Sequence, residues 1–296
     1  MRTDFPRGCN KGDLVENIRG AADQRVPRLT RAANISGDQD EVPADPGNNF
    51  GKKNEKNRKP FPFLGMNSKT SSSSGLKREH EPVDILSSSQ QPTSAFVIPK
   101  HYACHVRSVL ISRGQIQDRV EKLAADIRSS YAHTTVHLIC VLKGGSAFFH
   151  DLQSAFRALH NASGDAHVPF TFDFIRAKSY SGTESTGKVE ISACDLSKLK
   201  GRDVLLVEDI IDTGTTMSLL LPLLKEEGLP KSIAVASLLE KRREDKDVKF
   251  VADFVGFSVP DEFVVGYCLD YNDAFRDLQH ICCISPEGIE RFKDGI

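Results

Sequence analysis

Residues 204–217 read VLLVEDIIDTGTTM, and this stretch decides the fold of the chain. An aliphatic run ends in two adjacent carboxylates, Glu208 and Asp209, and a third carboxylate, Asp212, follows after two isoleucines. The next four residues are Thr-Gly-Thr-Thr, which open a predicted helix. A buried strand that leads through acids into a helix indicates an α/β sheet whose carboxyl edge carries the ligand site.

The threonine-rich turn, residues 213–216, indicates a phosphate site. Backbone N–H groups and hydroxyls at a helix N-terminus form a cradle for anions. The paired acids before it suit ribose hydroxyls, so a sugar phosphate fits the whole stretch. The Gly-Lys-Ser/Thr ending of a Walker loop is absent, and so are the three glycines of a dinucleotide fingerprint. A plain polar strand end before an ordinary helix explains each feature singly but not their combination.

Strands and helices alternate through the rest of this region. We expect helices at 115–129, 147–159 and 215–227, and strands at 136–142, 170–175, 203–207, 232–239 and 250–257. Near-continuous apolar strands between helices indicate a mostly parallel sheet with helices on both faces. Pro222 lies inside the third helix and should kink it. The acid-rich loop should lie at the topological switch point of the sheet.

The stretch resembles the phosphoribosyl-pyrophosphate (PRPP) signature of type I phosphoribosyltransferases. The match continues in LKGG (142–145), KSY (178–180), ASLLEKR (236–242), DFVGF (253–257), PDEFVVGYCLDYN (260–272) and FRD (275–277). Together these residues resemble the hypoxanthine-guanine phosphoribosyltransferase family of purine salvage, from about Ala95 to the end of the chain. The resemblance implies the type I phosphoribosyltransferase fold, a mostly parallel sheet flanked by helices with a small hood and lid region.

The resemblance also implies a reaction. Hypoxanthine or guanine would react with PRPP to give IMP or GMP and pyrophosphate, with Mg²⁺ as cofactor. Asp212 matches the family's catalytic position and would exchange the proton on purine N7, a role that contributes about 10²–10⁴-fold in rate. Because Asp is also a favoured helix N-cap, capping is an alternative role for Asp212, and both roles are compatible.

Eleven positions would bind PRPP or nucleotide under this resemblance: Lys143, Gly144, Glu208, Asp209, Ile210, Ile211, Thr213, Gly214, Thr215, Thr216 and Arg276. Two glycines after a strand permit close approach of an anion, and Lys143 supplies charge, so pyrophosphate is the natural ligand of this loop. The family has a non-proline cis peptide before this lysine. Active members often carry Lys at the position of Thr215, and the change could weaken PRPP affinity.

A second group would bind the base and the metal. The implied base-binding residues are Lys241, Glu262, Phe263, Val264 and Asp270. Lys241 would donate to the 6-oxo group of the purine, and Phe263 would stack on the ring. Asp270, together with Glu208 and Asp209, would hold magnesium.

Residues 179–189 (SYSGTESTGKV) form a long polar segment that starts with Ser179 and Tyr180. The resemblance implies that this segment is a mobile lid. Closure would exclude water, which otherwise attacks the reacting sugar. A plain surface loop has the same composition, so the residues alone leave both possibilities open.

Composition argues against nucleic-acid and membrane partners. The 296 residues carry a net charge of −1, so no global field attracts polyanions. No apolar run approaches the roughly 20 residues that span a bilayer, and the N-terminus lacks the apolar core of a secretory signal. Seven scattered cysteines form no disulfide framework, which favours a reducing compartment. We therefore expect a cytoplasmic protein.

Residues 1–94 differ from the rest. Residues 48–59 are polar and basic, residues 71–75 read SSSSG, and residues 87–91 read SSSQQ. Such segments bury too little apolar surface to offset the entropy of ordering. We expect a disordered extension at 1–94, in which Met66 could be an alternative start, and a phosphoribosyltransferase domain at 95–296.

Two other functions remain open. The chain could be a catalytically weak, nucleotide-binding paralogue that acts as a regulator, although every expected catalytic position is filled. It could also be a xanthine-preferring homologue, since backbone carbonyls are expected to read the 2-position of the base. The family further implies a homodimer or homotetramer.

Overall fold

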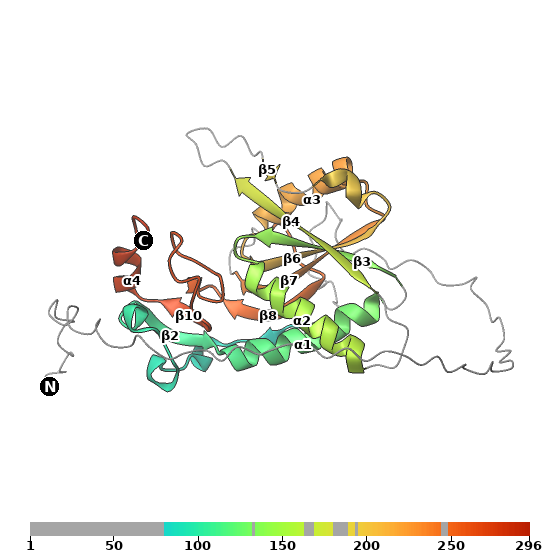
Figure 1. Ribbon diagram of the computed structural model, residues 1–296. Coiled ribbons are helices and arrows are strands. Elements are labelled where there is room, and N and C mark those ends of the chain that lie inside the picture. Colours follow the sequence, from blue (N-terminus) through green and yellow to red (C-terminus); the bar gives the residue numbers. More distant parts are fainter. Residues whose placement is uncertain (1–79, 132–133, 163–168, 180–188, 193–194, 244–247) are drawn as a thin grey trace, which may run out of the picture. The chain divides into compact units, whose positions relative to one another are not determined.

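The computed structural model describes residues 80–131, 134–162, 169–179, 189–192, 195–243 and 248–296 (Figure 1). The expected disorder of residues 1–79 therefore concerns a part of the chain that lies outside this description. The three-layer α/β arrangement that the sequence predicts is confirmed in the described part.

The main sheet has seven strands among the described residues, in the order β1-β8-β7-β6-β3-β4-β5. The strands are β1 (Val83–Asp84), β3 (Val136–Leu142), β4 (Phe170–Ser179), β5 (Val189–Ser192), β6 (Asp203–Ile211), β7 (Ser232–Arg242) and β8 (Phe254–Pro260). All neighbours pair in parallel except β4 and β5. The chain builds outward in opposite directions from β3 and β6, so the topological switch point lies between these two strands.

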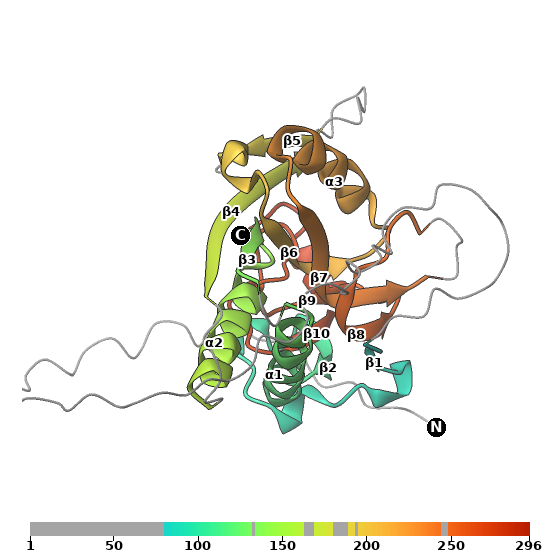
Figure 2. The ribbon, with the colours of Figure 1, turned by 90° about the vertical axis from the view of Figure 1, so that its right-hand side faces the viewer.

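Helices cover both faces of this sheet, as Figures 1 and 2 show. Helices α1 (Arg113–Ser130) and α2 (Ser146–Ala162) lie on one face, and α3 (Thr215–Gly228) lies on the other with the 3₁₀ helix η4 (Leu196–Leu199). Leu138 and Leu205 point into the core under α1 and α2, whereas Ile139 and Leu206 point into the core under α3. This alternation explains the continuous apolar runs. Helix α3 continues through Pro222. None of the described helices is long and apolar enough to cross a membrane.

A second, antiparallel sheet forms the hood that we expected. Its strands are β2 (Val106–Ile111), β10 (Ile281–Ile284) and β9 (Val264–Val265), in that order, and α4 (Pro286–Arg291) follows β10. A separate core lies beneath it, in which Tyr102 stacks on Phe275 with 4.6 Å between ring centroids and Phe292 meets Phe275 edge to face. Three further 3₁₀ helices precede β2, at Ser87–Ser89 (η1), Thr93–Ala95 (η2) and Lys100–Tyr102 (η3).

Several strands are longer than the sequence suggests. The strand expected to end at Val207 continues to Ile211, so Glu208 and Asp209 lie in β6 and not in the loop after it. The pairing with β7 explains this, because Glu208 is in register with Ser237 and the ladder uses backbone groups whatever the side chain. In the same way β7 extends to Arg242 and includes Lys241, whereas β8 starts only at Phe254.

The folded part begins before Ala95, where we expected the domain to start. Strand β1 pairs in parallel with β8, Val83 opposite Phe257. Ile85 is only 5% exposed and belongs to the core under α1 and α2, and its amide donates to the carbonyl of Ser258. A short apolar cluster between polar runs thus adds an edge strand to the sheet.

Candidate active site

The loop after β3 touches the end of β6 at Gly144. A β-carbon placed on Gly144 would lie 1.6 Å from Oδ2 of Asp209, so only glycine fits against this carboxylate. The peptide bond between Leu142 and Lys143 is cis, as the resemblance implies. Two motifs that stand far apart in the sequence thus meet at the switch point.

The adjacent acids of β6 are electrostatically unusual. Burial, reinforced by the neighbouring Asp209, raises the pKa of Glu208 well above its ordinary value. Burial also raises the pKa of Asp209 to about 6, although the Ile210 amide and Arg276 act in the opposite direction. Oε2 of Glu208 is buried and makes no hydrogen bond within the protein. The pair is therefore suited to accept hydrogen bonds from hydroxyl groups or to bind a cation.

The start of α3 is built to receive an anion. Gly214 is the N-cap with φ of 75°, and a β-carbon there would lie 2.7 Å from the backbone nitrogen of Phe250. The N-cap residue offers no side chain, but Oγ1 of Thr213 accepts from the N–H of Thr215 at 3.3 Å and lies 2.8 Å from the hydroxyl of Thr215. Backbone amides at a helix start of this kind can bind an anion such as a phosphate. The alternative role of Asp212 as N-cap is wrong, since Gly214 holds that position.

Asp212 instead binds two cations from β7 and the residue after it. Nζ of Lys241 lies 3.1 Å from Oδ2 of Asp212, and Nη1 of Arg243 lies 2.5 Å from Oδ1. Burial acts to raise the pKa of Asp212, but the hydrogen bonds from Arg243 and Lys241 outweigh it, and the net shift is downward. Lys241 also lies 3.2 Å from Oδ1 of Asp261.

Sequence reasoning missed Arg243 and Asp261. A usable signal existed for Arg243, since residues two apart on a strand point to the same side and Lys241 was already assigned to the site. Asp261 offers no such signal. Its place beside Lys241 follows from the pairing of β7 with β8.

A network of charges links the other expected pyrophosphate binders. Nζ of Lys143 lies 2.9 Å from Oδ1 of Asp273, and Nη2 of Arg276 lies 3.1 Å from the same oxygen and 2.8 Å from Oδ1 of Asp270. Arg276 also donates to the carbonyl of Cys268. Asp273 was missed by sequence reasoning. Its ion pairs bring Lys143 and Arg276 to one place.

The loop that carries Asp270 and Asp273 is strained. Five of its non-glycine residues have φ between 50° and 71°: Tyr267, Cys268, Asn272, Asp273 and Phe275. Left-handed conformations of this kind are costly for residues with a β-carbon, and they gather at functional sites.

The expected base-binding residues border the hood. Phe263 is 49% exposed and meets Tyr271 edge to face, with 5.4 Å between ring centroids. Val264 begins β9 and pairs with β10. The carboxylate of Glu262 is bound by Arg107 at 2.7 Å and by Gln90, so this side chain anchors the loop to the hood. Phe263 thus offers exposed aromatic surface two residues after Asp261, which pairs with Lys241.

Magnesium is the cofactor that the resemblance implies. The described residues include no group of three or more His, Cys, Asp or Glu side chains placed to hold a metal on their own. Mg²⁺ commonly binds through one or two carboxylates plus substrate phosphates, however. Oε2 of Glu208, which makes no hydrogen bond within the protein, fits that kind of site, and Asp270 would have to exchange its ion pair with Arg276 for the metal.

The remaining sequence-predicted residues divide into two groups. Ile210 and Ile211 complete β6, and Thr216 lies exposed in the first turn of α3. Ser179 is the last residue of β4 and is in register with Val189. Tyr180 and the rest of the expected lid, through residue 188, lie outside the described residues.

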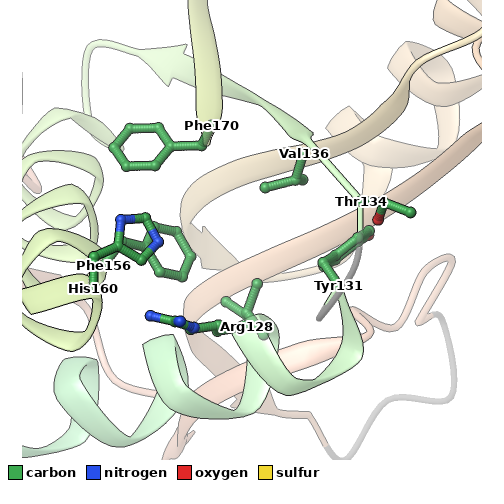
Figure 3. A pocket seen from close by; sticks show the side chains of 8 residues that line it. Arg128, Tyr131, Thr134, Val136, Phe156, His160 and Phe170 are labelled. Carbon is green, nitrogen blue, oxygen red and sulfur yellow. The ribbon is translucent and has the colours of Figure 1, made fainter. Parts of the chain in front are cut away.

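Two hollows in the described part lie away from this edge. The first, shown in Figure 3, has a volume of only about 20 Å³, room for about one water molecule. Its lining comes from α1, α2 and the starts of β3 and β4: Ile127, Arg128, Tyr131, Thr134, Val136, Phe156, His160 and Phe170. The second, of about 390 Å³, includes His137, Thr171 and Asp203 at the amino ends of β3, β4 and β6. Neither hollow contains a predicted site residue.

Known proteins resemble the chain over the same region. Residues 112–272 match the phosphoribosyl transferase domain family. Hypoxanthine-guanine phosphoribosyltransferase of Canis lupus familiaris is 51% identical over 199 residues, which cover 67% of this chain and 90% of the relative. The Homo sapiens enzyme of that name is 50% identical with the same coverage.

A solved structure agrees with these sequence matches. The crystal structure of hypoxanthine-guanine phosphoribosyltransferase from Schistosoma mansoni in complex with IMP is similar with a TM-score of 0.61 and 38% identity. The similarity covers 72% of this chain and all of that one. With its acids, its cis peptide and its helix start gathered at one sheet edge, the chain belongs to the hypoxanthine-guanine phosphoribosyltransferase family of purine-salvage enzymes.

Proposed function

We propose that the protein transfers the 5-phosphoribosyl group of PRPP to hypoxanthine or guanine, giving IMP or GMP and pyrophosphate. The observation that carries this proposal is the contact of 3.1 Å between Lys241 and Asp212. A 6-oxopurine presents an acceptor, O6, next to a donor, N7–H. An ammonium beside a carboxylate matches that edge, whereas the 6-amino group of adenine would direct N–H groups at Lys241.

The placement of each group supports a role in binding PRPP. The first-turn amides of α3, with Thr213, Thr215 and Thr216, would hold the 5′-phosphate. Glu208 and Asp209 would accept hydrogen bonds from the ribose hydroxyls. Lys143 and Arg276, which share Asp273, would turn to pyrophosphate with the amides that follow Gly144.

The chemical step makes and breaks one bond at the anomeric carbon. The bond from this carbon to pyrophosphate breaks, the bond to purine N9 forms, and the proton on N7 passes to Asp212. Positive charge develops on the sugar as the leaving group departs, and the nearby acids Glu208 and Asp209 stabilise it. Phe263 would hold the base against this centre by stacking.

Magnesium completes the proposal as cofactor. Asp270, with Glu208 and Asp209, would hold it together with substrate oxygens. When bound, it would neutralise charge on the pyrophosphate oxygens.

We also propose that the enzyme is cytoplasmic and forms a homodimer or homotetramer. Phe172 and Phe174 support the oligomer, because they lie 46% and 37% exposed on one strand and contact each other and Phe149 edge to face. Exposed aromatic surface of this kind is enriched at subunit interfaces. Light scattering on the purified protein measures the mass in solution, and a monomer at micromolar concentration would contradict the oligomer.

The function is tested by incubating purified protein with PRPP, magnesium and one base at a time. Hypoxanthine and guanine should be converted to IMP and GMP, adenine should not react, and EDTA should stop the reaction. Chromatography of the nucleotides gives the rates. Xanthine as the best substrate would favour the xanthine-preferring alternative. Nucleotide binding without turnover of any base would favour the weak paralogue.

A further inference from the structure

Both carboxylate oxygens of Asp212 are engaged by cations. Lys241 binds Oδ2 at 3.1 Å and Arg243 binds Oδ1 at 2.5 Å. The proposed reaction needs one of these oxygens to receive the N7 proton of the purine. Each oxygen can accept a second hydrogen bond, but a purine N7–H that approaches Oδ1 would compete with Arg243 for this oxygen.

We propose that Arg243 is a displaceable counter-ion of Asp212, which competes with the purine for Oδ1 and so sets the affinity of the enzyme for its base. The inference rests on the proposed function, since it assumes that Asp212 meets the purine. Arg243 is thus a specificity-determining residue that acts through Asp212 and is distinct from the catalytic group itself.

The surroundings indicate which cation gives way. Lys241 lies within β7, in register with Val259 of β8, and its side chain is 10% exposed. It also lies 3.2 Å from Oδ1 of Asp261, and in this position it would bind O6. Its contact with Oδ2 leaves the other oxygen of Asp212 for N7–H.

Arg243 is held less firmly by the backbone. It follows Arg242, the last residue of β7, so its backbone lies beyond the hydrogen-bonded ladder. Its side chain is 19% exposed, and Asp212 is 44% exposed, which places this ion pair at the mouth of the site. A partly exposed ion pair at a strand end exchanges with a ligand more readily than a buried one.

Displacement would also change the proton affinity of the carboxylate. A carboxylate that binds two cations is a poorer proton acceptor than one that binds a single cation. Loss of the Arg243 contact as the base enters would make Asp212 more basic when the N7 proton has to leave. Arg243 would therefore weaken base binding, and it would keep Asp212 ionised until the base binds.

Steady-state kinetics of Arg243→Met test the inference. Methionine keeps much of the length of the side chain and removes its charge. The KM for hypoxanthine and for guanine should fall roughly three- to tenfold, as expected for the loss of a competing, partly exposed ion pair. The KM for PRPP should not change. Arg243→Lys, which keeps the charge, should restore most of the wild-type KM for the base.

Two further variants control for charge and folding. Arg157→Met removes one positive charge from an exposed position on α2 and should leave both KM values unchanged. Arg243→Gln provides a second neutral variant if the methionine variant has a lowered melting temperature. A lower KM for purines in both neutral variants, with an unchanged KM for PRPP, supports the inference.

An unchanged KM for the purines in Arg243→Met overturns the proposed role of Arg243. A raised KM overturns it too, because it would indicate that Arg243 binds the base. Calorimetric binding of hypoxanthine in the presence of pyrophosphate and magnesium provides a readout that needs no turnover. Tighter binding by Arg243→Met is expected there too. A wild-type protein that forms no nucleotide would contradict the proposed function, whereas equal binding by wild type and variant would contradict only the role of Arg243.

Discussion

The carboxylate of Asp209 lies where a side chain on Gly144 would have to be. An added β-carbon would come within 1.6 Å of Oδ2 and 2.6 Å of the carboxyl carbon. This contact joins the loop after β3 to the end of β6. The position of the proposed pyrophosphate loop therefore depends on that of the acids proposed to bind ribose, and the reverse.

Gly144→Ala should impair PRPP binding without unfolding the protein. The overlap falls on the end of a side chain, so Asp209 can rotate away and the backbone can stay. We expect kcat/KM for PRPP to fall by roughly ten- to hundredfold, equivalent to about 1.5–3 kcal/mol of lost interaction. Thermal melting should change little. Gly201→Ala is the control. Gly201 lies just before the amino end of β6, where an added β-carbon would meet no atom within 4 Å, so this variant tests only the strain of a φ of 72°. Equal loss of activity in both variants would contradict a specific role of the Gly144 contact.

Asp212→Asn should abolish most turnover and preserve the fold. A carboxamide cannot take up the N7 proton, so kcat should fall by about 10²–10⁴-fold while the KM for PRPP stays similar. Loss of the ion pairs to Lys241 and Arg243 should cost about 1 kcal/mol or less, because Asp212 is 44% exposed. Rapid-quench turnover and thermal melting give the two quantities. Near-normal turnover of Asp212→Asn would show that another residue is the general base.

Lys241→Ala should weaken binding of the base more than binding of PRPP. An unpaired 6-oxo group costs about 1–3 kcal/mol, so the KM for hypoxanthine and guanine should rise by roughly ten- to hundredfold. Lys231→Ala is a matched control, since Lys231 pairs with Asp203 at the amino ends of the strands. Steady-state kinetics with each substrate varied in turn separate the two effects. Equal rises in both KM values would show that Lys241 does not recognise the base.

Truncation should locate the start of the folded part. Deletion of residues 1–78 keeps His80, which stacks on Phe254, and should leave activity and melting temperature nearly unchanged. Deletion of residues 1–94 also removes β1 and Ile85, whose burial alone contributes about 1.5–3 kcal/mol. We expect a clear fall in melting temperature for the second truncation only. Equal melting of both truncated proteins would show that β1 adds nothing to stability.

His137 should contribute a loss of stability as the pH falls below about 6.5, whereas the raised pKa values of Glu208 and Asp209 act in the opposite direction. Burial, followed by the charge of Arg202, lowers the pKa of this histidine, which is only 2% exposed and lies 2.7 Å from Thr171 Oγ1. The unfolded chain takes up a proton near the ordinary pKa of histidine and the folded chain does so only at lower pH, so acid favours unfolding.

Urea midpoints at about pH 7.5 and about pH 5.5 measure this effect. Relative to wild type, His137→Gln should shift the change in midpoint between the two pH values towards greater stability at the lower pH. His105 and His280 also have lowered pKa values, so they act in the same direction as His137 in both proteins. A pH dependence identical to that of wild type would show that His137 does not contribute.

Local pattern was enough for much of the fold. Strand β3 is predicted with both ends correct, because a short apolar run with several β-branched residues between polar residues is typical of a buried strand. The start of α3 at Thr215 is also predicted correctly. Gly214, directly before it, has φ of 75°, a backbone conformation that a strand does not contain. The catalytic and phosphate-binding candidates follow from the same short stretch, where residue type and spacing carry the chemistry.

The tertiary structure alone decided which charges meet. Lys143 and Asp273 stand 130 residues apart in the chain, and the ion pair between them depends on how the hood loop reaches the end of β3. The position of Arg243 against Asp212 depends on the register of β7 beside β6. Hydrophobic periodicity determines each strand and helix locally, because burial of one face is a property of neighbours in sequence. Contacts between side chains at the sheet edge depend on strand order and register, which are set by the packing of the whole chain.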